Sequence, residues 1–472
     1  MEVSKLILLS GILLSQAAAQ RPTEGGFFSF EPADVVMTYD TSNVRVHYSV
    51  DGPNQTRLTD ADETGVPDFV EEVGETAEEV LLFYESLGFL PPISEEEMGL
   101  ELGGAPSFDF YLVDFGGSAD GLFGIDACDS CRCSGYMVME NDFQGYGYPS
   151  ISEAITVLVS HELFHAVQAA YNAEQESWLS EGMAVWAEYA FDPGVYDFFA
   201  FCGAYLADSG RPFYSPPAGA LNAFSYGTAL FFAYMDIQLG RESLVYLQQE
   251  LQSCDDDVSL DATLATIESD GTVLATFWSS FAIWNLATGS RAGLIDSYPF
   301  AERLNGLTPE AEGTIIEEDH RFYPLAASYF LLLHEGGDLI FSITEETEGV
   351  FFSLHPTVDG QVDSPLAQWD AVGPMDLLWE DLPKGDYWLV GTYPENASQS
   401  EKFAFCLGAD CELSAAQEEP PETSIKPEQT ACNGCSTATG GLGKGVFWAL
   451  LIFVNRRRWL IPSEPNTHDA SG

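Results

Sequence analysis

Apolar and polar positions change their spacing along this chain, and these changes predict where strands give way to helices. Four short segments near the start alternate apolar and polar residues, as strands with one buried face do. These segments are residues 35–39, 44–50, 108–114 and 135–140. Residues 69–87 instead repeat apolar positions every three to four residues, with acidic residues between them. That spacing predicts an amphipathic helix.

The middle of the chain is predicted to be helical. Residues 151–172 are apolar on every side of a helix, which predicts a helix buried in the interior. Ser150 and Glu153 form the capping box that would begin it. A helical pattern resumes at Trp178 and continues to the breaker Pro193. Two further helical stretches, residues 222–251 and 273–287, complete a predicted helical lobe.

The pattern changes again after Gly313. Short apolar runs separated by Gly, Asp and Pro turns continue from residue 327 to residue 407, which is typical of a β-sandwich. We therefore predict an α+β protein. Its first domain, residues 27–310, combines a mixed sheet with the helical lobe, and its second, residues 320–413, is a small all-β sandwich. Residues 414–431 are rich in Glu, Pro and Ser and predict a linker.

The N-terminal composition predicts the compartment, and the net charge excludes one class of partner. Residues 1–19 predict a secretory signal peptide, with Lys5, an apolar run and then small residues before the expected cleavage site. The protein is therefore expected to be exported. Across 472 residues, 74 Asp and Glu against 17 Lys and Arg give a formal net charge of −57. Nucleic acid is excluded as a partner because phosphate binding needs positive charge.

The nine cysteines predict disulfides, because an exported chain meets an oxidising environment. Cys128, Cys131 and Cys133 lie in one loop, and a metal site there would lack the second cluster that completes four ligands. A small loop could be closed by Cys406 and Cys411. A longer one could be closed by Cys202 and Cys254.

The strongest chemical signal is His161-Glu162-Leu-Phe-His165 within the predicted buried helix. Residues four apart project from the same helical face, so the two imidazoles can bind one zinc ion. Glu162 beside them can act as the general base that deprotonates a zinc-activated water. The alternative is a chance match in a core helix. Buried histidines next to a buried glutamate would then be costly without partners.

A second helix supplies two candidates for a third zinc ligand. Glu181 follows a predicted turn and can fold back toward the histidines, which leaves one metal position open, as in catalytic zinc sites. The run Trp178-Leu-Ser-Glu181-Gly-Met-Ala184 resembles the gluzincin signature, in which this glutamate binds the zinc. The resemblance favours Glu181, although Glu188 on the same helical face is the rival ligand.

The segment between residues 60 and 71 matches a calcium-binding loop, with Thr64 as a departure at one ligand position. Its oxygen ligands suit a hard cation, and Gly65 allows the sharp turn that such a loop needs. The predicted calcium ligands are Asp60, Asp62, Thr64, the Val66 carbonyl, Asp68 and Glu71. The alternative is an acidic turn that caps the following helix.

Four segments between residues 30 and 290 carry a wider resemblance: Gly65-Val-Pro-Asp68, Tyr111-Leu-Val-Asp114, Glu140-Asn-Asp-Phe143 and His161-Glu-Leu-Phe-His-Ala-Val-Gln168. With these segments, residues 30–290 resemble a group of secreted bacterial proteins that are assigned by motif as metalloproteases. The resemblance implies a zincin-like metalloprotease domain, zinc as cofactor, and a protein or peptide substrate. It also implies that the strand at residues 135–140 is the sheet edge along which an extended peptide pairs. In gluzincins a tyrosine before a helix of the C-terminal lobe often stabilises the oxyanion, and Tyr226 has a comparable position.

The C-terminal tail, residues 432–458, combines Cys435, a short apolar run and an arginine cluster. It resembles the myxobacterial sorting tail (MYXO-CTERM), in which the cysteine is the processing site. The run has ten apolar residues, fewer than the roughly 20 that span a bilayer, so a frayed amphipathic tail is the alternative. Sorting would attach the protein to the cell surface through the Cys435 segment.

These features predict a secreted or cell-surface zinc metallopeptidase that hydrolyses peptide bonds with Glu162 as the general base. The alternative is a calcium-binding cell-surface adhesion protein whose zincin lobe is inactive. The intact Glu162 favours the enzyme, because a degenerate lobe commonly loses its base first.

Overall fold

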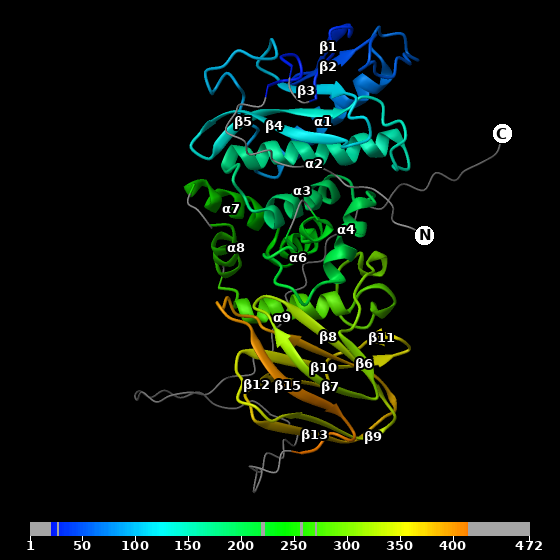
Figure 1. Ribbon diagram of the computed structural model, residues 1–472, viewed down its shortest axis with the longest axis vertical. Helices are drawn as coiled ribbons and strands as arrows, with labels where there is room; N and C mark the ends of the chain where they lie inside the picture. The colour runs from blue at the N-terminus through cyan, green and yellow to red at the C-terminus, as the bar shows by residue number, and fades with distance from the viewer. Residues whose placement is uncertain (1–19, 26–27, 219–221, 255–257, 270, 414–472) are drawn as a thin grey trace, which may run out of the picture. The chain divides into compact units, whose positions relative to one another are not determined.

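The first sheet brings together strands from both sides of the predicted acidic helix. The computed structural model describes residues 20–25, 28–218, 222–254, 258–269 and 271–413 (Figure 1). The sheet has the order β1-β2-β3-β5-β4, in which β2, β3 and β5 run parallel and the two outer strands run antiparallel to their neighbours. Its strands are β1 (Val36–Asp40), β2 (Val44–Ser49), β3 (Phe108–Val113), β4 (Gly121–Asp129) and β5 (Arg132–Glu140).

The edge of this sheet differs from the sequence prediction. The strand predicted over residues 135–140 is part of β5, which is paired on both sides, by β3 and by β4. The edge strand next to β5 is β4, and β1 forms the opposite edge. Sequence reasoning missed β4 because its glycines and polar residues break the apolar alternation. The prediction that residues 135–140 form the sheet edge is therefore wrong.

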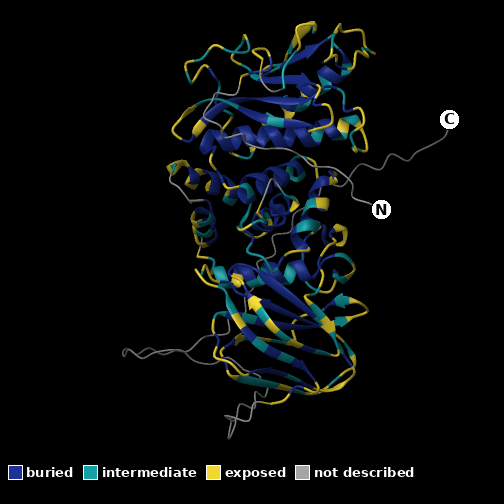
Figure 2. Ribbon diagram, viewed as in Figure 1, coloured by how far each residue is buried: buried dark blue, intermediate teal, exposed yellow. Residues whose placement is uncertain are grey.

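Two helices cover one face of the sheet. The acidic helix α1 (Asp68–Ser86) buries an apolar stripe that includes Val73, Ala77 and Val80. Helix α2 (Ile151–Tyr171) is buried on nearly every side from Ala154 onward, as its apolar composition predicts (Figure 2). The side chain of Ser150 caps α2 by accepting a hydrogen bond from the Glu153 amide at 3.1 Å. This burial fixes α2 between the sheet and the helices that follow it.

The helical lobe follows α2, and its helices are shorter than the sequence predicts. The segment 222–251 forms three helices rather than one, and Gly240, with a positive φ of 89°, ends the middle one. The helices of the lobe are α3 (Ser177–Phe191), α4 (Asp197–Leu206), α5 (Ala223–Gly227), α6 (Ala229–Leu239), α7 (Glu242–Glu250), α8 (Val258–Glu268) and α9 (Leu274–Leu286).

The remaining strands form two sheets that pack face to face around a separate apolar core. Strand β7 begins at Ile315, earlier than the predicted domain start at residue 320, and pairs with β15. One sheet contains β6 (Ala311–Gly313), β8 (Ala327–His334), β10 (Val350–Val358), β11 (Gln361–Val362), β12 (Ala367–Ala371) and β14 (Gly385–Thr392). The other contains β7 (Ile315–Phe322), β9 (Gly337–Ile343), β13 (Met375–Leu382) and β15 (Glu401–Gly408).

The helical lobe contacts the β-sandwich through α9. The indole of Trp278 donates a hydrogen bond to the Ala326 carbonyl at 3.2 Å, and the Tyr329 hydroxyl donates one to the Ala282 carbonyl at 2.9 Å. All four residues are buried. With separate sheets and helices along the chain, the described protein belongs to the α+β class.

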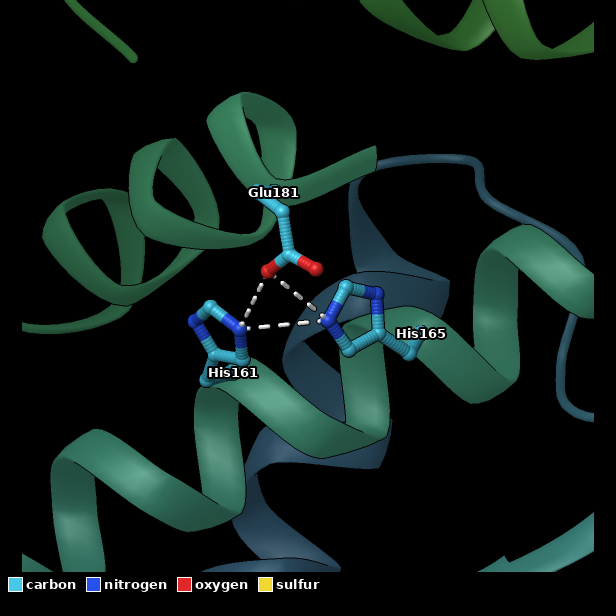
Figure 3. A group of neighbouring side chains, drawn as sticks. All are labelled: His161, His165 and Glu181. Carbon is cyan, nitrogen blue, oxygen red and sulfur yellow. Dashed lines mark hydrogen bonds and ion pairs between the residues drawn. The ribbon is translucent and has the colours of Figure 1, made fainter. Parts of the chain in front are cut away.

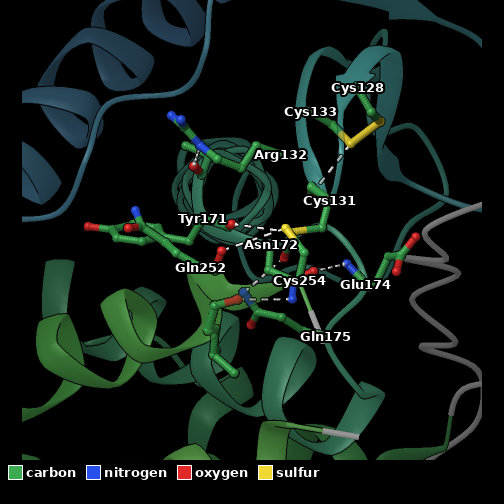
Figure 4. The surroundings of a disulfide bond; sticks show 12 residues. Cys128, Cys131, Arg132, Cys133, Tyr171, Asn172, Glu174, Gln175, Gln252 and Cys254 are labelled. Carbon is green, nitrogen blue, oxygen red and sulfur yellow. Dashed lines mark hydrogen bonds between the residues drawn. A yellow bond between two sulfur atoms is a disulfide. The ribbon is translucent and has the colours of Figure 1, made fainter. Parts of the chain in front are cut away.

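Three disulfides connect the cysteines of the described residues. Cys128 pairs with Cys133, and Cys406 pairs with Cys411. Cys131 pairs with Cys254, so the predicted Cys202–Cys254 pair is wrong (Figure 4). Cys202 is buried as a free thiol on α4. The third disulfide ties the tip of the β4–β5 hairpin to the segment that follows α7.

No helix among the described residues is long and apolar enough to cross a membrane. The predicted signal peptide, linker and sorting tail lie outside the described residues. The disulfides are compatible with an extracellular protein.

Candidate metal centre

Helix α2 presents both predicted histidine ligands on one face. The Nε2 atoms of His161 and His165 lie 3.1 Å apart, and the two rings are nearly perpendicular (Figure 3). His161 is fully buried and His165 is 3% exposed. A helix repeats about every 3.6 residues, so this convergence follows directly from the i, i+4 spacing.

Helix α3 brings Glu181 to the same point. The turn between the helices begins at Asn172, which ends α2, and finishes at Glu176, which precedes α3. The Oε2 atom of Glu181 then lies 3.3 Å from His161 Nε2 and 3.5 Å from His165 Nε2 (Figure 3). Ligand atoms of the three residues all lie within 4.8 Å of one another. Two imidazole nitrogens and one carboxylate oxygen form a donor set typical of catalytic zinc sites.

Two further side chains contact the histidines at their Nδ1 atoms, away from Glu181. The Nδ1 atom of His161 lies 2.6 Å from the Oε1 atom of Glu188. The Nδ1 atom of His165 lies 2.8 Å from the Oε1 atom of Gln168, whose amide in turn donates to the Ser180 carbonyl at 2.9 Å. Such hydrogen bonds fix the tautomer and orientation of metal-binding imidazoles. Glu188 therefore contacts the outer nitrogen of His161, whereas Glu181 faces both inner nitrogens.

The charges around this point favour a cation at its centre. Burial acts to raise the pKa of Glu181, but the charge of His165 and hydrogen bonds with both histidines lower it to about 2. Burial acts to lower the pKa of His161, but hydrogen bonds with Glu181 and Glu188 raise it well above its ordinary value. Both shifts mean that the carboxylates stabilise positive charge between them. Protons or a metal ion can supply that charge.

Glu162 lies beside the three candidate ligands without a partner. It is fully buried, and neither of its carboxylate oxygens has a hydrogen-bond partner among the described residues. Burial raises its pKa to about 7, although the charges of His165 and His161 act to lower it. A buried carboxylate without hydrogen bonds is costly. A water molecule held by a metal ion would satisfy it, so the residues present fit a zinc ion.

The edge strand β4 approaches the same carboxylate. A Cβ atom added to Gly121, the first residue of β4, would lie 3.4 Å from the Cγ atom of Glu162. A larger residue at position 121 would therefore press against this side chain. Sequence reasoning gave β4 no role, because no motif in β4 indicates that it lies beside α2.

Tyr226 lies in α5 and is buried beside the histidines. Its ring is stacked on that of His161, with the ring centroids 5.9 Å apart, and also on Phe201 at 4.8 Å. It is 2% exposed. The structure thus brings the predicted catalytic tyrosine beside His161, one of the candidate metal ligands.

A second group of candidate metal ligands lies in the predicted calcium loop. Carboxylate oxygens of Asp60, Asp62 and Asp68 lie within 4.8 Å of one another. The Thr64 hydroxyl donates to Glu71 at 2.8 Å and lies 3.4 Å from the Val66 carbonyl. Gly65 has the positive φ of 91° that the sharp turn requires. The loop is largely exposed and directly precedes α1.

Comparisons with known proteins do not assign a family. No family model and no curated protein matches the chain. About a fifth of the chain resembles each of three small solved structures. A mitogen derived from Yersinia pseudotuberculosis is 13% identical, with 22% of this chain and 91% of that chain covered and a TM-score of 0.18. The Aeromonas hydrophila periplasmic inhibitor of g-type lysozyme, PliG, is 14% identical, with 21% and 96% covered and a TM-score of 0.16.

The third is the pre-peptidase C-terminal domain of a Bacillus anthracis collagenase. It is 18% identical, with 22% of this chain and 98% of that chain covered and a TM-score of 0.15. TM-scores this low assign neither a shared fold nor a function. The chemistry of the site therefore rests on its own residues.

Proposed function

We propose that this protein is an exported zinc-dependent peptidase. The observation that carries the proposal is the position of Glu162, which is fully buried and unpartnered beside three converging zinc-type ligand atoms. If these residues were only part of the core, the buried Glu162 carboxylate would lack hydrogen bonds, which would lower the stability of the fold. The inactive adhesion lobe considered above gives no reason to retain it.

The mechanism follows from what each side chain can do. A bound zinc ion would lower the pKa of a coordinated water and polarise a peptide carbonyl. Glu162 takes the proton of the attacking water and passes it to the leaving amine. Glu188 and Gln168 keep the histidines in the tautomer that presents Nε2 to the metal.

The edge strand β4 is the surface on which we place the substrate. An extended peptide can add to the open edge of a sheet through backbone hydrogen bonds. Because Gly121 lies against Glu162, a peptide paired with the start of β4 would pass beside the general base. Tyr226, stacked on His161, is the side chain that we assign to the oxyanion. Strand β4 takes the role that the sequence gave to residues 135–140.

The experiment compares the mature protein with its Glu162→Gln variant. Zinc is measured by mass spectrometry, and proteolysis is measured on casein. General acid–base groups contribute about 10²–10⁴-fold, so the variant should keep its zinc and lose at least that factor in rate. Glu174→Gln makes the same change at an exposed position of the loop after α2 and should leave the rate unchanged.

Two outcomes would contradict the proposal. One is a wild-type protein that binds no zinc and cleaves no unstructured protein, which would favour the adhesion alternative. The other is a zinc-loaded Glu162→Gln variant that retains near-normal activity.

A further inference from the structure

A second set of carboxylates lies next to the candidate metal centre. Asp120 immediately precedes β4, and Asp197 begins α4. Asp120 is 3% exposed and Asp197 is 8% exposed. The residue after Asp120 is Gly121, which lies against the general base, so this set is adjacent to the place where a peptide bond would be cleaved.

Both aspartates carry a buried oxygen without a partner. The Oδ1 atom of Asp120 and the Oδ2 atom of Asp197 have no hydrogen-bond partner among the described residues, and neither aspartate pairs with a described Lys or Arg. The other oxygen of Asp120 accepts a hydrogen bond from the Tyr148 hydroxyl at 2.6 Å. Buried carboxylates are normally paired or hydrogen-bonded, so these oxygens indicate a missing cationic ligand.

The two aspartates belong to one electrostatic neighbourhood. Burial raises the pKa of Asp197 to about 7, and the nearby charges of Glu188 and Asp120 add to this effect. Burial likewise raises the pKa of the Tyr148 hydroxyl well above its ordinary value, helped by the charges of Asp120 and Asp197. The charges of the two carboxylates therefore act on one another and on Tyr148, and the resulting negative potential favours a cation.

The small number of ligands at this point favours an organic cation over a metal ion. Among the described residues, groups of three ligand atoms within 4.8 Å of one another occur only at the histidine site and at the loop of Asp60, Asp62 and Asp68. Asp120 and Asp197 belong to neither group, so they do not form a compact metal site. No third His, Cys, Asp or Glu of the described chain completes a compact metal site with Asp120 and Asp197. A lysine ammonium or an arginine guanidinium carries several donors and can be held by two carboxylates.

We infer that Asp120 and Asp197 form a subsite for a lysine or arginine side chain of the substrate peptide, close to the cleaved bond. This inference rests on the proposed peptidase function. A peptide paired along β4 would present alternate side chains to one face, and the one beside the start of β4 would lie near Asp120. Glu153, partly exposed on the first turn of α2, adds a further negative charge near Asp197.

The test uses acetylated, amidated alanine hexapeptides in which one position in turn carries Lys, Arg, norleucine or citrulline. Cleavage by the zinc-loaded mature protein is expected to give kcat/KM at least tenfold higher for Lys over norleucine and for Arg over citrulline at one position. Calorimetric binding to the inert Glu162→Gln variant should show the same preference. Charge-assisted hydrogen bonds are strong enough to produce a ratio of this size.

Asp197→Asn keeps the shape of the side chain and removes its charge. It is expected to reduce both ratios to near one, and Asp120→Asn provides a second variant if the first fails to fold. The control is Asp129→Asn, which changes an exposed aspartate at the far end of β4 and should keep both ratios.

The outcomes separate this inference from the proposed function. If nothing is cleaved but the inert variant binds Lys and Arg peptides through Asp197, the peptidase proposal fails and the subsite stands. If peptides are cleaved with equal kcat/KM whether the residue is Lys or norleucine, the peptidase stands and the subsite is overturned. Calcium or manganese binding that Asp197→Asn abolishes, in a background of Asp60→Ala with Asp62→Ala, would also overturn it.

Discussion

A single arginine, Arg21, lies just after the predicted signal-peptide cleavage site and pairs with three buried carboxylates. Arg21 is 1% exposed and contacts Tyr111, whose side chain lies on the face of the first sheet opposite α2. It makes two hydrogen bonds to Asp126, at 2.9 and 2.6 Å, lies 3.3 Å from Glu95, and forms an ion pair with Asp109. The side chains of these carboxylates are between 0% and 5% exposed. We expect replacement of Arg21 to destabilise the protein more than any surface arginine would.

The magnitude follows from the charge that would be left behind. Removing one partner of a buried ion pair costs about 3–5 kcal/mol, because the remaining charge stays desolvated and uncompensated. A whole domain is stable by only about 5–15 kcal/mol, so Arg21→Met should cost a large fraction of the free energy of unfolding. Arg21→Lys keeps the charge but loses the fork that grips Asp126, so its cost should be smaller.

The loss of unfolding free energy in Arg21→Met should also depend on pH. Burial raises the pKa of Glu95 even with Arg21 present, although the charge of Arg21 acts to lower it. A carboxyl whose pKa is higher in the folded state stabilises the fold below its unfolded pKa, and that contribution is lost as pH rises through the folded pKa. Without Arg21 the folded pKa should rise further. The destabilisation by Arg21→Met should therefore be larger at pH 8 than at pH 5.

Urea unfolding of the mature protein, followed by near-UV circular dichroism at both pH values, measures this cost. The control is Arg45→Met, because Arg45 pairs with the half-exposed Asp40 at the surface and such pairs contribute about 0–1 kcal/mol. Equal losses for Arg21→Met and Arg45→Met at pH 8 would refute the reasoning. So would a loss that does not change with pH.

Three further outcomes are expected. Glu181→Gln should abolish zinc binding, whereas Glu188→Gln should weaken zinc affinity only about 10–100-fold, because Glu188 orients His161. Dialysis of both variants against a chelator measures their zinc affinity, and a larger loss in Glu188→Gln would make Glu188 the ligand. With zinc saturating, calcium at a hundredfold excess over its dissociation constant should stabilise the protein by about 2.7 kcal/mol, and Asp60→Ala with Asp62→Ala should remove that gain. A melting curve that does not change with calcium would show that this segment is an acidic turn and not a calcium site. Replacing Cys131 and Cys254 by alanine opens a loop of 123 residues and should cost about 5 kcal/mol in urea unfolding by the chain-entropy model, so an unchanged midpoint would contradict it.

The sequence by itself determined the features that depend on local repeats. The four-residue spacing of His161 and His165 places both on one side of any helix, whatever surrounds it, so their convergence needed no tertiary information. The apolar composition around them predicted a buried helix, and the Ser150 cap marked where it begins. The calcium-loop residues also lie within one short turn, so their grouping was predictable from spacing alone.

The tertiary structure decided every relation between distant segments. Glu181 and Glu188 lie on the same side of one helix, and only the angle between α2 and α3 determines which carboxylate faces the inner nitrogens of the histidines. The pairing of Cys131 with Cys254 depends on where the β4–β5 hairpin meets the helical lobe. Strand order likewise put β4 rather than β5 at the sheet edge, because periodicity shows which face of a strand is buried but not which strand pairs beside it. Asp120 and Asp197 carry no motif, and only the tertiary structure brings their charges close enough to act on one another and on His161.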